Sequence, residues 1–180
     1  MRVVEEPDWI RSAISKYEQP LTLYALRILG DVERARDAVQ ETFLRLCSEN
    51  PGNIDGHVAE WLFTVCRSRA LDSQRKEKRM SPLQDVDARM RPSSEPLPAE
   101  AAERKETASL ALEMLGALPA NQQEVLRLKF QHGLSYREIS RITRLTVSNV
   151  GFLIHTGLKT LREKMNAAGE ASAAMRSSHS

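Results

Sequence analysis

A chain of 180 residues can form one mid-sized domain or two small helical domains, each with a modest core. Charged residues make up 28% of the chain and aromatic residues only 5%, a balance that favours amphipathic helices over a β sandwich. The formal net charge of +2 is too small to indicate a nucleic-acid-binding protein, so only the local distribution of charge can do so.

Signals for targeting, metal binding and catalysis are missing from the sequence. The first nine residues include Glu5, Glu6 and Asp8 instead of an apolar signal-peptide core, and no apolar run reaches the length of a membrane span. The histidines and cysteines lack metal-ligand spacing, and no phosphate loop or nucleophile with its base is present. We therefore expect a cytoplasmic chain without membrane insertion, metal, cofactor or enzymatic activity, in which Cys47 and Cys66 are buried.

Apolar residues at helical spacing predict four helices in the first 80 residues. The first begins at Asp8, and Pro20 opens a second that ends at Gly30. The third covers residues 32–48, and the fourth begins at Val58. The residues of the third helix that are expected to face inward are Val32, Ala35, Val39, Phe43 and Leu46.

Residues 49–57, between the third and fourth helices, contain the Pro, Gly and Asn residues typical of an ordered loop. At the far end of the fourth helix, basic residues outnumber acidic ones. The basic residues are Arg67, Arg69, Arg75, Lys76, Lys78 and Arg79. Such an excess suits phosphate binding, although most charge runs are only a solvated helix face.

The second half of the chain predicts a linker and a second helical domain. Prolines interrupt a polar, acidic stretch over residues 81–104, which is expected to be a flexible linker. The predicted fold is therefore all-α, with helical domains over residues 8–80 and 105–165. Residues 166–180 have no apolar periodicity and are expected to be disordered.

Residues 134–164 are predicted to form a helix, a tight turn and a longer helix. Ser135 and Glu138 have capping-box spacing, Leu145 fills the turn, and Thr146 caps the longer helix. The apolar stripe of the longer helix is Val147, Val150, Ile154, Leu158 and Leu161. This arrangement is typical of a helix-turn-helix that enters the major groove, although a plain helical hairpin has the same pattern.

Three segments, residues 34–43, 61–72 and 118–164, resemble those of one known family. In this order, and with a linker between them, they resemble a bacterial RNA polymerase sigma factor of the extracytoplasmic-function (ECF) type, which keeps only the second and fourth conserved regions. The resemblance covers nearly the whole chain. It implies a transcription initiation factor that binds core polymerase and directs it to promoters.

The resemblance implies that the third helix binds the clamp helices of the largest polymerase subunit, with the polymerase flap as a further partner. The residues concerned are Asp37, Gln40, Glu41 and Phe43. Acidic side chains suit a basic partner surface, but an ordinary solvated helix face has the same composition. The family also implies promoter DNA as a partner, a monomer when free and, in many members, an anti-sigma factor, for which no residue here is diagnostic.

Melting the minus-ten promoter element requires stacking surfaces and cations beside unpaired bases. By resemblance, this set is Asn53, Trp61, Phe63, Arg67, Ser68, Arg69, Arg75 and Lys76. The loop over residues 50–57 would hold a flipped base. A core position for Trp61 is at least as compatible with the pattern, and the family usually has Asn in place of Ser68, which weakens a base contact there.

The minus-thirty-five element would be read as duplex by the longer helix of the helix-turn-helix. By resemblance, this set is Arg137, Arg144, Thr146, Ser148, Asn149, Phe152, Thr156 and Lys159. Asn149 suits an adenine, and Phe152 or Thr156 suits a thymine methyl group.

This chain departs from the family at several of these positions. Family members commonly have Lys, Ser and Arg at residues 151–153, Gly in place of Arg144 and Ala in place of Ser140. We therefore expect an unusual sequence preference, and strain at Arg144 if its φ angle is positive.

Two alternatives remain open at this point. One is a dimeric helix-turn-helix regulator that binds an operator without polymerase. The other is an adaptor that binds polymerase or an anti-sigma factor through residues 151–153. A DNA-reading domain would lose affinity steeply as salt rises, whereas an apolar protein interface would not.

Overall fold

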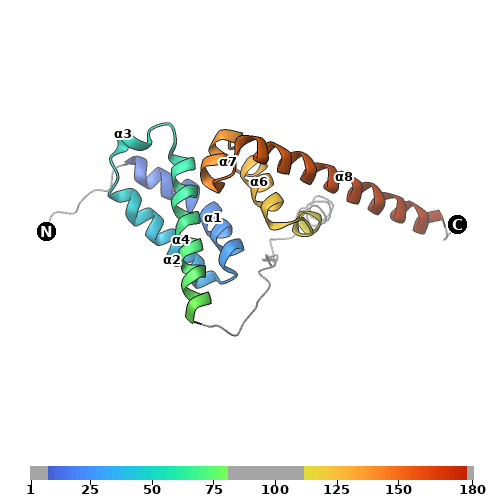
Figure 1. Cartoon of the computed structure of the whole chain (residues 1–180), viewed down its shortest axis with the longest axis horizontal. Coiled ribbons are helices and arrows are strands. Elements are labelled where there is room, and N and C mark those ends of the chain that lie inside the picture. Colours follow the sequence, from blue (N-terminus) through green and yellow to red (C-terminus); the bar gives the residue numbers. More distant parts are fainter. Residues whose placement is uncertain (1–7, 81–111, 178–180) are drawn as a thin grey trace. The chain divides into compact units, whose positions relative to one another are not determined.

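A computed structural model gives the structure of residues 8–80 and 112–177, which divide into two compact units (Figure 1). The first unit contains helices α1 to α4, and the second contains α6, α8 and all of α7 except its last three residues. Within these described ranges every regular element is a helix, so the all-α, two-unit prediction is confirmed. The expected linker over residues 81–104 lies outside the described residues.

Three helices of the first unit, α1 (Asp8–Leu29), α2 (Val32–Cys47) and α4 (Val58–Met80), pack against one another, and α3 (Pro51–Ile54) is a single turn (Figure 1). Their shared core is mostly apolar. Its largest fully buried side chains are Leu21, Leu46, Leu62 and Phe63. Burial of each such side chain contributes about 1.5–3 kcal/mol to the stability of the unit.

The predicted break at Pro20 is wrong, because α1 is one continuous helix through this proline. An internal proline removes one backbone hydrogen bond and costs about 3 kcal/mol. Buried residues nevertheless lie on both sides of it, with Ala13 before and Leu21 and Tyr24 after. Packing of this continuous face outweighs the local cost of the proline.

Two residues at the ends of α2 were expected to be buried and are exposed. Val32 is the first residue after the Asp31 cap, and its side chain is 44% exposed. Cys47 is the last residue of α2 and is also exposed. Both lie beyond the part of the helix that packs. Cys66 is buried as expected, and burial raises the pKa of its thiol to about 12, which keeps the thiol protonated and unreactive at neutral pH.

The second unit is built from α6 (Ala120–Phe130), α7 (Tyr136–Thr143) and α8 (Val147–Ser177). Helices α6 and α8 pack closely where Leu126 meets Gly157. A Cβ atom on Gly157 would lie 2.9 Å from Leu126 Cδ1, so the glycine allows the close approach. Within the described ranges, no helix combines the length and apolar character needed to cross a membrane.

The predicted apolar stripe of α8 is correct only in part. Val150 and Ile154 are buried as expected, whereas Val147 and Leu158 are exposed. The rest of the buried face is formed by Leu153 and Gly157. Residues 150, 153, 154 and 157 also have helical spacing. Because a glycine is not counted as apolar, the sequence pattern favoured a stripe that shares only Val150 and Ile154 with the buried face.

Helix α8 continues to Ser177 and so includes residues 166–177 of the segment for which the sequence predicts disorder. Alanine is frequent in this stretch of the sequence. Since alanine has the highest helix propensity, a helix can extend here without apolar periodicity.

The turn between α7 and α8 has the predicted caps. Ser135 and Glu138 form the capping box, with a 2.7 Å hydrogen bond from Ser135 N to Glu138 Oε2. Thr146 Oγ1 accepts a hydrogen bond from Asn149 N at 3.2 Å. Arg144 adopts the left-handed conformation, with φ 61° and ψ 24°, so the expectation of strain at this residue is confirmed. Ser140 Oγ donates a 2.6 Å hydrogen bond to Leu145 O, which ties α7 to the turn.

We predict that Arg144→Gly stabilises the second unit by about 0.5–1 kcal/mol. Relief of the left-handed conformation gains about 1–2 kcal/mol, and the greater freedom of glycine in the unfolded chain offsets part of it. Arg162→Gly is the matched control, because Arg162 lies exposed within α8, where glycine costs about 1 kcal/mol. Urea denaturation of the three proteins measures both changes. Destabilisation by Arg144→Gly as large as that by Arg162→Gly would contradict the strain at this turn.

Candidate polymerase and nucleic-acid surfaces

One face of α2 presents the polar residues expected to bind polymerase. Asp37, Gln40 and Glu41 are exposed on it. Leu44, which lies three and four residues beyond Glu41 and Gln40, is 62% exposed. Phe43 is only 8% exposed, so its predicted inward position is confirmed, and the ring of this member of the polymerase-binding set offers little surface to a partner. Helical spacing from Gln40 and Glu41 could have identified Leu44, which also lies outside the apolar stripe predicted to face inward.

A charged groove of about 160 Å³ separates this face of α2 from α4. The residues that line it are Arg34, Asp37, Ala38, Glu41, Arg69, Asp72, Ser73 and Lys76. Arg69 Nε lies 3.6 Å from Glu41 Oε2. Arg34 forms an ion pair with Glu77 and donates a 3.1 Å hydrogen bond to Ser73 Oγ. Two cross-helix ion pairs of opposite polarity therefore join α2 to α4, and one of them links Glu41 on the acidic face of α2 to Arg69.

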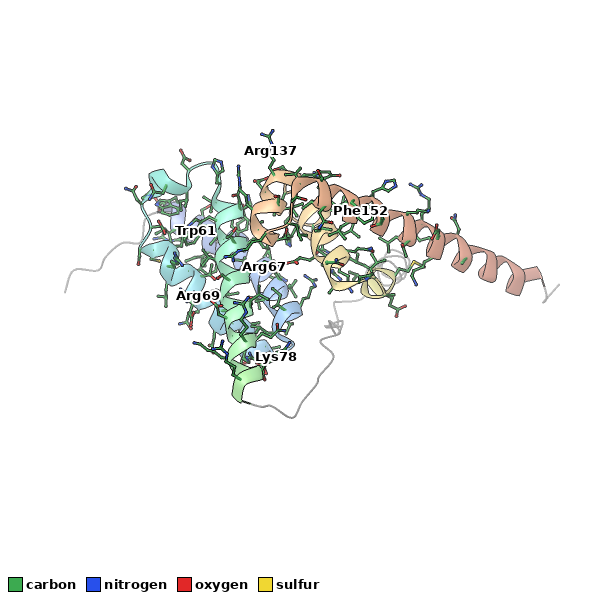
Figure 2. The ribbon with its side chains drawn as sticks, viewed as in Figure 1. Trp61, Arg67, Arg69, Lys78, Arg137 and Phe152 are labelled. Atoms are coloured by element: carbon green, nitrogen blue, oxygen red, sulfur yellow. The ribbon has the colours of Figure 1, made fainter. Side chains whose placement is uncertain are left out.

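The residues of α4 expected to bind DNA do not share one face. Figure 2 shows Trp61 and Arg69 on one side of α4 and Arg67 on the other. Helical geometry explains this, because Arg67 is four residues after Phe63 and continues the side of α4 that Phe63 occupies. Exposed residues on the side of Trp61 include Ser68, Arg75 and Lys76. Arg67 is thus not brought together with the rest of the set.

Phe63 was expected to support or stack on the melted strand, but its side chain is fully buried. Its ring packs edge-on against that of Tyr24 in α1, with centroids 5.2 Å apart and an interplanar angle of 82°. Trp61, two residues earlier, is half-buried and keeps part of its surface accessible. Stacking on a base is therefore open to Trp61 and not to Phe63.

The short loop around α3 is ordered by its own hydrogen bonds. Asn50 caps α3 by accepting a 3.1 Å hydrogen bond from Gly52 N. Gly56 has φ 72°, a conformation that favours glycine, and His57 Nδ1 lies 2.9 Å from the Asp55 carbonyl oxygen. Asn53 is exposed on this loop. The loop therefore presents the Asn53 side chain from a backbone of fixed shape.

Exposed side chains along the first half of α8 form the surface expected to read duplex DNA. They are Ser148, Asn149, Phe152 and Lys159, together with His155, which the sequence analysis did not single out. Phe152 is 63% exposed. His155 lies three and four residues from Phe152 and Lys159, and this spacing could have identified it.

Four further residues of this set lie outside this row of side chains or use their side chains within the unit. Thr156 is half-buried, and its hydroxyl donates to Phe152 O at 2.9 Å while accepting from Gln122 in α6 at 3.4 Å. The hydroxyl of Thr146 is used as the cap of α8. Arg137, at the start of α7, is exposed and points outward (Figure 2), and Arg144 is exposed at the turn. The hydroxyls of Thr146 and Thr156 are thus bound within the unit.

The fold and these surfaces define a two-part helical protein whose second part is a helix-turn-helix, the arrangement of the sigma-70 class. Residues 13–80 match the family described as Sigma-70 region 2, and residues 109–161 match Sigma-70, region 4.

Curated relatives narrow the class. The ECF RNA polymerase sigma factor EcfG of Rhodopseudomonas palustris is 30% identical over 79% of this chain and 77% of its own length. SigL of Mycobacterium tuberculosis is 28% identical, and SigW of Bacillus subtilis is 25% identical, each over 89% of this chain and 90% of the relative. The chain belongs to the ECF RNA polymerase sigma factors and is a promoter-specific transcription initiation factor.

We predict that Phe63→Ala destabilises the first unit by about 3–5 kcal/mol, because it leaves a cavity against Tyr24. Trp61→Ala is the matched control and should cost less, about 1–2 kcal/mol, because part of the Trp61 surface is accessible to solvent. Thermal and urea denaturation of the two variants measure the difference. Equal destabilisation by the two changes would mean that Trp61 is a core residue and leave the unit without an accessible aromatic surface on α4.

Proposed function

We propose that the two units divide promoter recognition between them. The first binds core polymerase through α2 and the melted minus-ten strand through α4, and the second reads the minus-thirty-five duplex through α8. The observation that carries the proposal is the cluster of exposed Asp37, Glu41 and Leu44 on α2, beside the basic residues of α4. The chain itself catalyses no reaction in this proposal.

The polymerase surface combines charge with an apolar anchor. Two carboxylates, one amide and an exposed leucine lie on one helix face, so the proposed partner is a basic, partly apolar surface. The clamp helices of the largest polymerase subunit are proposed for this role. The polymerase flap is proposed as the site of the second unit.

The minus-ten surface combines one aromatic residue with cations. Trp61 offers a stacking surface, and Arg69 lies on its side of α4 (Figure 2). Helical spacing places Arg75 and Lys76 on the same side, where the three cations suit the phosphates of a single strand. Asn53, held on the ordered α3 loop, offers hydrogen-bonding groups to an unstacked base. Phe63 supports this surface from the core.

The minus-thirty-five surface is small and partly apolar. Ser148 and Asn149 are exposed in the first turn of α8, and Phe152 follows one turn later. Asn149 is proposed to pair with an adenine, and Phe152 to contact a thymine methyl group. Arg137, Arg144 and Lys159 are proposed to bind phosphates.

The proposal also covers partners and location. We propose that the free chain is a monomer in the cytoplasm, and that an anti-sigma factor covering the α2 face would prevent polymerase binding. The adaptor alternative is weaker, because Leu153 is buried and only Phe152 of residues 151–153 presents a large apolar surface.

We predict that Asp37→Arg/Glu41→Arg weakens binding to core polymerase by about 30-fold or more, since loss of one interfacial charge pair costs about 2 kcal/mol or more. Glu18→Arg reverses an exposed charge on α1 and is the matched control. Equilibrium binding of labelled protein to purified core polymerase measures the affinity. Unchanged binding of the double variant would exclude α2 as the polymerase interface.

We predict that Asn149→Ala removes the adenine preference at one position of the minus-thirty-five element, a loss of about 1–3 kcal/mol of discrimination. Lys159→Ala should instead weaken binding to all promoter sequences alike and reduce the slope of log affinity against log salt concentration by about 0.9. Selection of promoters randomised at this element with each holoenzyme measures the base preference, and binding to one promoter at several salt concentrations measures the slope. Identical selected sequences from wild type and Asn149→Ala would show that Asn149 reads no base.

A further inference from the structure

Glu41 and Arg69 belong to different proposed surfaces but contact each other. Glu41 lies on the polymerase face of α2, and Arg69 lies on the DNA face of α4. Arg69 Nε is 3.6 Å from Glu41 Oε2 across the groove. Their side chains are 41% exposed for Arg69 and 58% exposed for Glu41, so a partner on either side can reach the pair.

Arg75, another arginine of the minus-ten set, has a different kind of partner. Arg75 Nη1 lies 3.5 Å from Asp72 Oδ1, and both residues are on α4, one turn apart. No residue of α2 takes part in that pair. A protein that binds the exposed face of α2 would therefore compete for Glu41 and leave the pair of Arg75 intact.

We propose that Glu41 exchanges partners when the sigma factor binds polymerase. In the free chain Glu41 neutralises Arg69; in the holoenzyme Glu41 pairs with a cation of polymerase, and Arg69 becomes available to a DNA phosphate. This inference rests on the proposed polymerase interface of α2. It makes Arg69 a positioning residue for polymerase binding and links that binding to the phosphate affinity of α4.

The size of the effect follows from the exposure of the pair. Exposed ion pairs contribute little, so the expected coupling between Glu41 and Arg69 is about two- to fivefold in affinity. Coupling of this size reduces binding of free protein to DNA and favours DNA contact after holoenzyme formation, without blocking either event. The effect should weaken at high salt.

The test measures affinity for core polymerase in the absence of DNA. Arg69→Gln should bind core polymerase about two- to fivefold more tightly than wild type, because Glu41 no longer has to leave Arg69. This gain in affinity should vanish when Arg69→Gln is combined with Glu41→Gln. Arg69→Lys, which keeps the charge, should increase the affinity only slightly. Arg75→Gln removes the same charge from a pair that α2 does not join, and should leave the affinity unchanged. Circular dichroism of each variant verifies folding.

Each result bears on a separate claim. A gain with Arg69→Gln that persists with Glu41→Gln, or that Arg75→Gln reproduces, would indicate general charge repulsion and overturn the partner exchange. Weakened binding by Glu41→Gln with no gain from Arg69→Gln would also overturn the exchange but leave the polymerase interface standing. Unchanged binding by Glu41→Gln would overturn both the partner exchange and the polymerase interface on α2.

Discussion

The packing of α4 against α1 and α2 is the constraint on which the functional surfaces of the first unit depend. Leu62 and Phe63 bury one side of α4, and Phe63 is fixed edge-on against Tyr24. Since a helix turns by about 100° per residue, this burial decides which side chains remain accessible. Trp61 stays on the accessible side with Arg69, while Arg67 is carried to the other side (Figure 2).

The second unit depends on a close helix contact and a strained turn. Gly157 allows α8 to approach Leu126 of α6, and the buried face that includes it leaves Asn149 and Phe152 exposed. The turn that starts α8 places Arg144 in a conformation that glycine adopts more easily. The hydrogen bond from Ser140 to Leu145 O spans this turn. The two residues that depart from the family pattern, Ser140 and Arg144, therefore both belong to the structure of the turn between α7 and α8.

The sequence predicted features that depend on local chemistry and missed those that depend on packing. The capping box of Ser135 and the cap at Thr146 follow from short-range hydrogen bonding and were correct. The continuity of α1 through Pro20 could not be predicted, because it depends on burial on both sides of the proline. The same limit applies to the candidate site: family resemblance selected Phe63 by position, but only the tertiary structure shows that its side chain is fully buried.

The central claim is that this chain directs core polymerase to specific start sites. The most direct test is run-off transcription on a library of genomic fragments with purified core polymerase, with and without the chain, followed by sequencing of transcript 5′ ends. The account predicts discrete start sites that require the chain and share sequence elements at the minus-ten and minus-thirty-five positions. If the chain binds DNA fragments without polymerase and produces no new start sites, the account is contradicted, and an operator-binding regulator takes its place.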